Sequence, residues 1–137
     1  MRVSAKADYA VRAMIELDAA KASEARPAKG EAISAAQGIP VSFLERILSE
    51  LRINGLVHSK RGSDGGYWLG REPTEIHVAD IIRAVEGPLA SVRGEAPDEL
   101  DYRGNAEPLR DVYIALRTSI RDVLENVSLA DLRPTQS

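Results

Sequence analysis

The apolar residues between positions 41 and 55 recur at helical spacing, which predicts an α-helix with one buried stripe. The members of this stripe are Leu44, Ile47, Leu48 and Leu51. Ser42 and Glu45 are three residues apart and predict a capping box at the start of the helix. Gly55 stands where a left-handed residue commonly ends a helix. The opposite, polar face of this helix is therefore expected to point to solvent or to a ligand.

A shorter helix is expected at 31–37, and the turn Gly38-Ile39-Pro40 cannot continue it because proline lacks the backbone donor. Two helices joined by a tight turn that contains glycine predict a helix-turn-helix. Beyond it the period changes to alternation over 57–61, which resumes at 67–69 after the glycine-rich residues 62–66. This pattern predicts a two-stranded hairpin, or wing.

The predicted hairpin carries Lys60 and Arg61 at its tip, which suits contact with a DNA backbone or minor groove. The net charge of the chain is −3, but the two halves differ in sign. Residues 1–71 hold 11 Lys and Arg against 8 Asp and Glu, whereas residues 72–137 hold 7 against 13. The asymmetry predicts a polyanion-binding front half and a back half that does not touch the polyanion.

The second strong helical repeat lies at 107–126, where apolar positions step by four and three residues, as in the seam of a helix pair. The positions are Leu109, Tyr113, Leu116, Ile120, Val123 and Val127. Before it, Ser4 can cap a long first helix, residues 22–29 form a loop, and an amphipathic helix spans 78–85. The polar stretch 89–107 lacks periodicity and is expected to be a loop.

Too little chain remains to cover the apolar face of the C-terminal helix, so this face needs a partner. We favour a symmetric homodimer, whose two-fold axis would suit a palindrome with half-sites about 34 Å apart or a multiple of that distance. The alternative is that the helix folds back onto the first helix of its own chain. After it, Ser128 and Asp131 predict one capped turn, and residues 133–137 are expected to fray.

The expected fold class is mainly α with a small β-hairpin wing: a winged helix-turn-helix domain followed by a long dimerisation helix. The DNA-binding domain would span 1–87, a loop 88–106, and the dimerisation helix with its tail 107–137. The start of the chain does not have the pattern of a signal peptide, and no apolar run reaches the length of a membrane span. These features, and the absence of Cys, are compatible with a cytoplasmic protein.

Three stretches, taken together in order and spacing, resemble the IscR/NsrR/CymR-type winged-helix regulators of bacteria, the Rrf-two family. They are Met1–Ser4 with Tyr9–Met14, Ile39–Val57, and Arg61–Leu69. The resemblance covers nearly the whole chain. It implies a transcription regulator that binds double-stranded DNA, and we expect a repressor that blocks promoter access.

The resemblance also implies which residues touch DNA, from the first helix and from the second helix of the helix-turn-helix. With the wing tip, the candidate contacts are Ser4, Lys6, Tyr9, Ser42, Phe43, Glu45, Arg46, Ser49, Lys60 and Arg61. Arg46 can fork to guanine, and Glu45 can accept from cytosine unless its capping role competes. Phe43 either reaches a thymine methyl or staples its helix to the core. Ser4 and Tyr9 have plainer alternatives, as a cap and as a core residue.

Family members that sense iron–sulfur status carry three cysteines between the short helix and the dimerisation helix, whereas the corresponding residues 92–108 contain none. Because the sequence has no Cys, we expect no iron–sulfur cluster and no other cofactor or metal. His58 and His77 are interpreted as surface or capping residues rather than a metal pair. The glycine-rich residues 62–66 lie between two strands, unlike a nucleotide-binding loop. No residues suggest an enzyme.

The competing class is a protein-interaction module that uses a winged-helix fold without reading DNA. The acidic second half and Trp68 motivate this alternative. Trp68 is expected on the less buried face of the wing, packed on a neighbouring helix or, less favoured, beside a ligand or partner. The effector, whether a small molecule or a protein, is not identified by the sequence.

Overall fold

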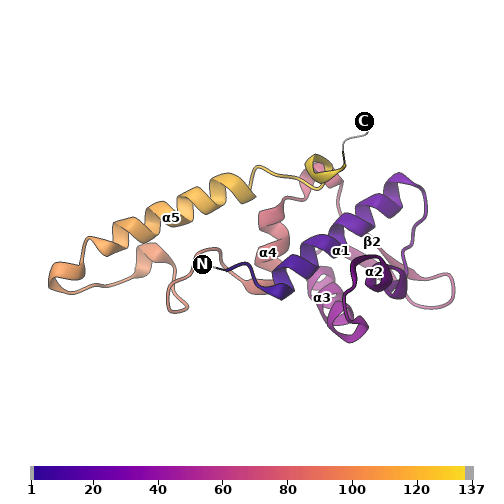
Figure 1. Ribbon diagram of the computed structural model, residues 1–137, viewed down its shortest axis with the longest axis horizontal. Coiled ribbons are helices and arrows are strands. Elements are labelled where there is room, and N and C mark those ends of the chain that lie inside the picture. The colour runs from indigo at the N-terminus through magenta and orange to yellow at the C-terminus, as the bar shows by residue number, and fades with distance from the viewer. Residues whose placement is uncertain (1, 135–137) are drawn as a thin grey trace.

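The computed structural model describes residues 2–134 and confirms a mainly helical fold with one two-stranded antiparallel hairpin (Figure 1). The helices and strands are α1 (Ala5–Ala22), α2 (Gly30–Gln37), α3 (Val41–Ile53), β1 (Val57–Lys60), β2 (Gly66–Leu69), α4 (Val78–Glu86) and α5 (Leu109–Leu124). Within residues 2–134, no helix has the length and apolar composition needed to cross a membrane.

The first helix begins at a serine cap, as predicted. The Ser4 hydroxyl oxygen accepts a hydrogen bond from the Ala7 backbone N–H at 3.0 Å, which satisfies a donor that the helix itself leaves unpaired. From there α1 runs across the back of the helix-turn-helix and packs against α3 and α4. It is therefore the scaffold on which α3 is held.

The helix-turn-helix forms as predicted, except for the way in which α3 begins. Gly38 adopts the left-handed conformation at φ 65° and ends α2. Pro40, not Ser42, is the N-cap of α3, and its carbonyl oxygen accepts from the Leu44 N–H at 2.9 Å. The predicted capping box of Ser42 with Glu45 is therefore wrong, because Ser42 already lies within the first helical turn and makes no capping hydrogen bond.

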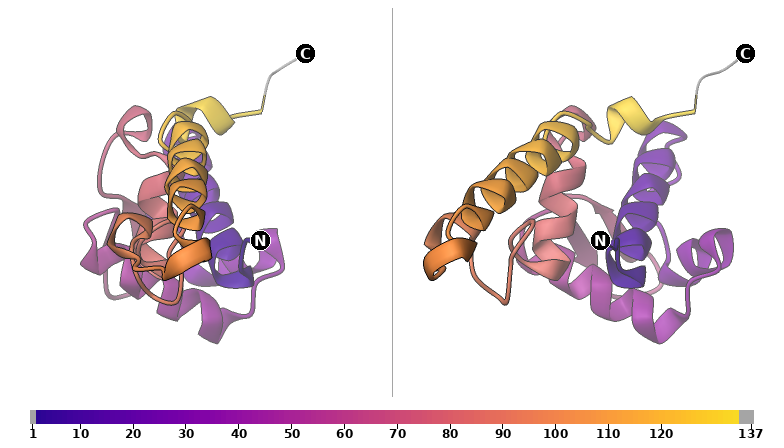
Figure 2. Two further views of the ribbon diagram at one scale, coloured as in Figure 1. Left: turned by 90° about the vertical axis from the view of Figure 1, so that its left-hand side faces the viewer. Right: turned by 60° about the vertical axis from the view of Figure 1, so that its left-hand side comes forward.

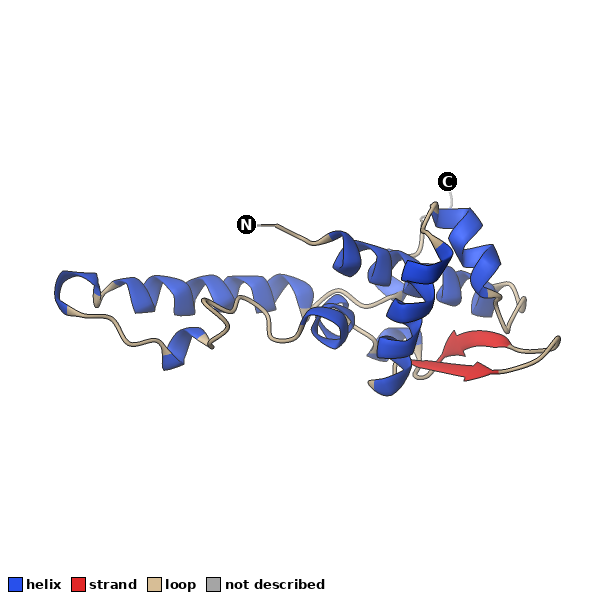
Figure 3. Ribbon diagram, turned by 90° about the horizontal axis from the view of Figure 1, so that it is seen from below, coloured by secondary structure: helices blue, strands red, loops and turns tan. Residues whose placement is uncertain are grey.

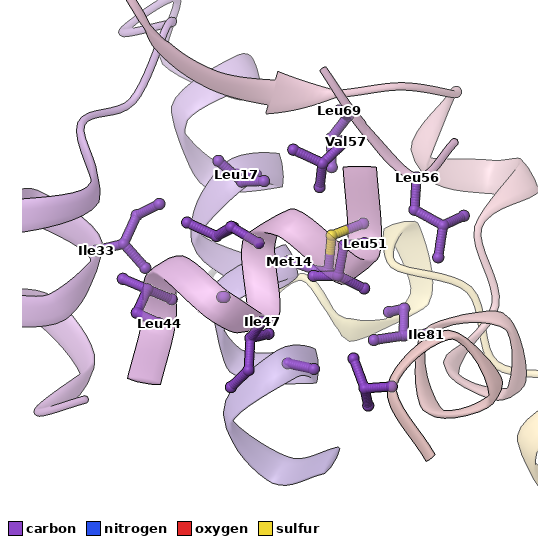
Figure 4. Packing of buried hydrophobic residues seen from close by; sticks show 14 of the residues in the cluster. Met14, Leu17, Ile33, Leu44, Ile47, Leu51, Leu56, Val57, Leu69 and Ile81 are labelled. Atoms are coloured by element: carbon purple, nitrogen blue, oxygen red, sulfur yellow. The ribbon is translucent and has the colours of Figure 1, made fainter. Parts of the chain in front are cut away.

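The core forms where α1, α3, the wing and α4 meet (Figure 4). The predicted apolar stripe of α3 is completely buried there. Fully burying an aliphatic side chain contributes about 1.5–3 kcal/mol, so this stripe is a principal attachment of α3 to the scaffold. Its neighbours in the cluster include Met14, Leu17, Val57, Leu69, Ile81 and Leu129.

The wing pairs Val57 with Leu69 and Lys60 with Gly66 at its two ends. Tyr67 on β2 also pairs with Ala28, through backbone hydrogen bonds of 2.8 and 2.9 Å, so the loop before α2 borders the hairpin. A Cβ added at Gly65 would lie 2.0 Å from the Lys60 carbonyl oxygen, so the tight turn requires glycine at that position.

The helix α5 extends away from the core and is accompanied by the segment 88–108 (Figures 1 and 3). That segment contains short 3₁₀ turns but no α-helix or strand, which agrees with the predicted loop. It is nevertheless packed on α5: Leu100 is buried, and Arg117 Nη1 donates to Asp98 Oδ1 at 2.9 Å. The loop and α5 together form an arm.

The chain after α5 returns to the core instead of fraying. The predicted seam placed Val127 on the C-terminal helix, but α5 ends at Leu124 and Val127 lies beyond it. The Val127 carbonyl oxygen instead accepts a hydrogen bond from the Val78 N–H at 2.9 Å, at the start of α4. Ser128 and Asp131 form the predicted capped turn. Arg133 is bound to Asp18, so the prediction of a frayed tail is wrong at Arg133, while residues 135–137 lie outside the described residues.

Candidate nucleic-acid interface

One face of α3 is turned away from the core and carries the predicted DNA contacts of this helix. Ser42, Phe43, Glu45 and Arg46 are exposed, and Ser49 is half-buried. This follows from the helical period, because the four buried leucine and isoleucine positions occupy the opposite face. Because no capping box forms, the Glu45 carboxylate is not held by the backbone at the start of α3.

A polar depression of about 370 Å³ lies between α3 and the wing. Its α3 wall consists of Glu45, Ser49 and Arg52, and its wing wall includes Lys60 and Arg61. The structure therefore brings together residues from both predicted DNA-contacting elements on one concave surface. Sequence analysis missed Arg52, although its spacing of three residues from Ser49 was the available signal.

The tip of the wing is held by a residue that sequence analysis also missed. Lys29, the residue before α2, donates from Nζ to the Gly62 and Ser63 carbonyl oxygens at 3.2 and 2.8 Å. These bonds tie the turn next to Arg61 to the helix-turn-helix. Nothing in the sequence indicated this contact, because it depends on how the wing folds back onto the start of α2.

The first turns of α1 reach the same region through Lys6. Its ammonium lies 2.8 Å from Oε2 and 3.0 Å from Oε1 of Glu50 on α3, so it is already paired within the protein. Ser4 is directed elsewhere: its hydroxyl donates to the carboxylate of Glu86, at the end of α4. Of these two residues, only Lys6 contacts the helix that carries the predicted base contacts.

Tyr9 supports Phe43 from behind. The two rings meet edge to face with centroids 5.8 Å apart, and Arg12 lies over the Tyr9 ring at 5.0 Å. Arg12 also donates to the Gln37 carbonyl oxygen at 2.9 Å, which ties this stack to the end of α2. Phe43 remains 47% exposed, so it both packs against α1 and presents part of its ring to solvent.

The two histidines lie apart in the fold. His58 packs on the indole of Trp68, with the ring centroids 5.9 Å apart. His77 precedes α4, and its backbone N–H donates to Asp80 Oδ2 at 2.9 Å. Trp68 is half-buried. Among residues 2–134, no three His, Cys, Asp or Glu side chains cluster closely enough to hold a metal ion.

A helix-turn-helix followed by a hairpin, with the second helix and the hairpin lining one concave surface, defines a winged helix-turn-helix protein. A family profile described as "Rrf2: Iron-dependent Transcriptional regulator" matches residues 3–134. The chain thus belongs to the Rrf2 family of DNA-binding transcriptional regulators. This is the Rrf-two family that the sequence resembles, and its members are not enzymes.

Proteins of similar sequence support this family assignment. Rv1287 of Mycobacterium tuberculosis strain H37Rv, whose name assigns it to the HTH-type transcriptional regulators, is 52% identical over 132 residues, covering 96% of this chain and 81% of that protein. CymR of Bacillus subtilis, an HTH-type transcriptional regulator, is 37% identical over 133 residues, covering 96% and 89%.

Solved structures resemble this one over almost their whole length. The structure of B. subtilis CymR, described as the global cysteine regulator, superimposes with a TM-score of 0.78 at 36% identity and covers 96% of this chain and 95% of that one. The structure of T. potens IscR has a TM-score of 0.76 at 34% identity and covers 100% and 94%.

Because the family is described as iron-dependent, the side chains of this chain that could bind iron need to be compared with those that an iron–sulfur cluster requires. An iron–sulfur cluster is held by thiolates, and the sequence contains no Cys. In the segment where the resembled cluster-binding members carry cysteines, Asp98 is paired with Arg117 and Leu100 is buried. These residues do not fit an iron–sulfur cluster.

Proposed function

We propose that this protein is a homodimeric repressor of the bacterial cytoplasm that occupies a palindromic operator and works without an iron–sulfur cluster. The observation that carries the proposal is the concave surface shared by α3 and the wing, with Glu45, Arg52, Lys60 and Arg61 on its walls. A helix of this kind enters the major groove while the wing reaches the adjacent backbone or minor groove.

Base reading is assigned to the exposed face of α3. Arg46 can donate two hydrogen bonds to guanine, and Glu45 can accept from the amino group of cytosine. The exposed edge of Phe43 suits contact with a thymine methyl group, and its packing on Tyr9 keeps the ring from turning away. Ser42 and Ser49 can donate to bases or phosphates at the two ends of this face.

Phosphate contacts are assigned to Lys60 and Arg61 on the wing, with Arg52 as an addition from the structure. Lys6 can join them only by leaving or sharing Glu50, and Tyr9 contributes by supporting Phe43. Ser4 is the weakest candidate, because its hydroxyl is bonded to Glu86 and Ala7; its role in DNA binding would fall to the backbone at the start of α1.

Dimerisation is assigned to α5, none of whose 16 residues is buried within one chain. Leu109, Val112 and Val123 are 37%, 59% and 63% exposed, which is unusual for apolar side chains along one helix. Tyr113, Leu116 and Ile120 of the predicted seam are half-buried beside them. At 1.5 Å per residue α5 is about 24 Å long, enough for an extended helix–helix contact.

Selection of bound duplexes from a random pool tests this function. Enrichment of a two-fold symmetric sequence by the wild-type protein is the expected result, and a variant with Arg46→Ala and Arg61→Ala should enrich nothing comparable. A pool that stays random with the wild-type protein would refute the operator and favour the protein-interaction module.

A further inference from the structure

Asp18 is a buried carboxylate whose partner comes from the other end of the chain. It lies in the C-terminal third of α1 and is 3% exposed. Arg133 binds both of its oxygens, from Nε to Oδ2 and from Nη2 to Oδ1, each at 2.9 Å. A buried carboxylate is costly unless it is paired, so this bidentate contact determines where the C-terminal segment lies on α1.

A second ion pair joins the same region to α4. Arg83, on α4, is bonded to Glu125, the first residue after α5. Between the two ion pairs, the Leu129 N–H donates to the Ile76 carbonyl oxygen at 2.9 Å, and the Leu129 side chain enters the core. We call the two pairs, Asp18–Arg133 and Arg83–Glu125, the arm clamp.

The arm clamp acts at only one end of α5. This end lies beside α4 and next to the returning C-terminal segment, whereas the start of α5 is far from the core and accompanied only by the loop 88–108 (Figure 2). The angle between α5 and the helix-turn-helix is therefore determined near residue 125, where the clamp is.

We propose that the arm clamp consists of positioning residues for DNA recognition, which select the distance between the two half-sites of the operator. The inference rests on the proposed dimeric function. If two chains join through α5, rotating each DNA-binding unit about the end of α5 changes the separation of the two α3 helices. Each base pair of spacer moves and rotates the second half-site, since one turn of about 34 Å contains 10–10.5 base pairs. A rigid junction thus rejects incorrect spacers.

The clamp can be loosened without leaving a buried charge unpaired. The clamp variant carries Asp18→Ala, Arg133→Ala, Arg83→Ala and Glu125→Ala. The matched control carries Lys21→Ala and Glu72→Ala, because Lys21–Glu72 is also an ion pair of α1 with a later segment, at 2.9 Å, but does not involve residues 125–133. If the clamp variant does not fold, Asp18→Asn replaces it, since the amide keeps the shape and removes the charge.

Spin labels measure the junction directly, because a chain without Cys accepts labels only at introduced positions. Ala36→Cys on α2 and Thr118→Cys on α5 place exposed labels on either side of the junction. Dilution with unlabelled protein isolates the distance within one chain. The clamp variant should show a broader distance distribution than the wild type, and the control an unchanged one; equal widths in all three would overturn the proposal.

Operators with spacers lengthened or shortened by one or two base pairs give the functional measurement. The ratio of the affinities for operators with correct and incorrect spacers should be about tenfold smaller for the clamp variant than for the wild type. The affinity of the clamp variant for an isolated half-site should be unchanged. Wild-type spacer discrimination in the clamp variant would overturn the proposal. Failure of the proposed function has a different signature, because the wild-type protein would then select no palindrome while the label distances still report the junction.

Discussion

Arg61 follows β1 directly, at the point where the turn of the wing begins, and its side chain is exposed beside the depression shared with α3. A guanidinium in this position can neutralise one phosphate. Arg61→Ala should therefore weaken operator binding and lower the slope of log affinity against log salt concentration by about 0.9. Titrations at several salt concentrations measure both effects.

The control for Arg61 is Arg103→Ala, which removes an exposed arginine from the loop beside α5. This variant should keep the affinity and the salt slope of the wild type. If Arg61→Ala behaves in the same way as Arg103→Ala, the wing tip does not contact the DNA backbone.

Arg46 differs from Arg61 because it lies on the exposed face of α3, to which base reading is assigned in the proposed function. Arg46→Ala should relax the preference at one base pair in each half-site by about 1–3 kcal/mol, the range for a bidentate contact with guanine. Affinities for operators substituted at each position identify that base pair. A uniform loss across all operators would instead make Arg46 a phosphate contact.

At the scale of elements, the loop 88–108 and α5 form the arm through a charge-assisted contact. The hydrogen bond from Arg117 holds the pKa of Asp98 below its usual value of 3.8, aided by a backbone hydrogen bond within the loop. A lowered folded-state pKa means that the contact stabilises the protein fully above the pKa of the unfolded chain. This stabilisation is lost as the pH falls below about 3.8 through the lower folded-state pKa.

Asp98→Asn should remove this part of the acid sensitivity. Between pH 4 and pH 2, the free energy of unfolding of the wild type should fall more steeply than that of the variant, as measured by urea denaturation. Asp101→Asn changes an exposed carboxyl group of the same loop and provides the control. Parallel pH profiles for the wild type and Asp98→Asn would show that the Arg117 contact adds nothing to stability.

At the scale of the whole molecule, α5 is the surface most in need of a partner. Val112→Glu with Val123→Glu places charges on its exposed apolar side chains and should convert the proposed dimer to a monomer, as measured by sedimentation. Operator affinity should then fall about 100-fold or more, because two half-sites are no longer bound together. Thr118→Glu, at an exposed polar position of α5, is the control, and a dimer that survives both valine substitutions would place the interface elsewhere.

The family description suggests a dependence on iron, whereas the amino-acid composition of this chain does not support an iron–sulfur cluster. The family profile is described as iron-dependent, yet the chain lacks the thiolates that an iron–sulfur cluster requires. The segment before α5 is held by the Arg117–Asp98 ion pair and by contact between the tilted rings of Tyr102 and Tyr113, whose centroids are 6.4 Å apart. The arm of this protein is therefore ordered by its own side chains.

The sequence by itself determined the features that repeat locally. The apolar stripe of α3, the two strands of the wing and the left-handed glycine stop at Gly55, which follows α3 with φ 77°, were all predicted correctly, because each reflects neighbours within one or two turns of the chain. The family could also be identified from three short stretches. The α3 capping box failed at this same local scale, because Pro40 supplied the helix start that Ser42 was expected to supply.

Only the tertiary structure decided how the side chains of the candidate interface and of the arm clamp are held. Lys6 meets Glu50 across 44 residues of sequence, and Asp18 meets Arg133 across 115. The hydrogen bond from Lys29 to the wing tip and the hydrogen bond between Val78 and Val127 also join residues that are far apart in the sequence. Local periodicity records which face of an element is buried, but not which other element buries it, and that choice follows from packing the complete chain.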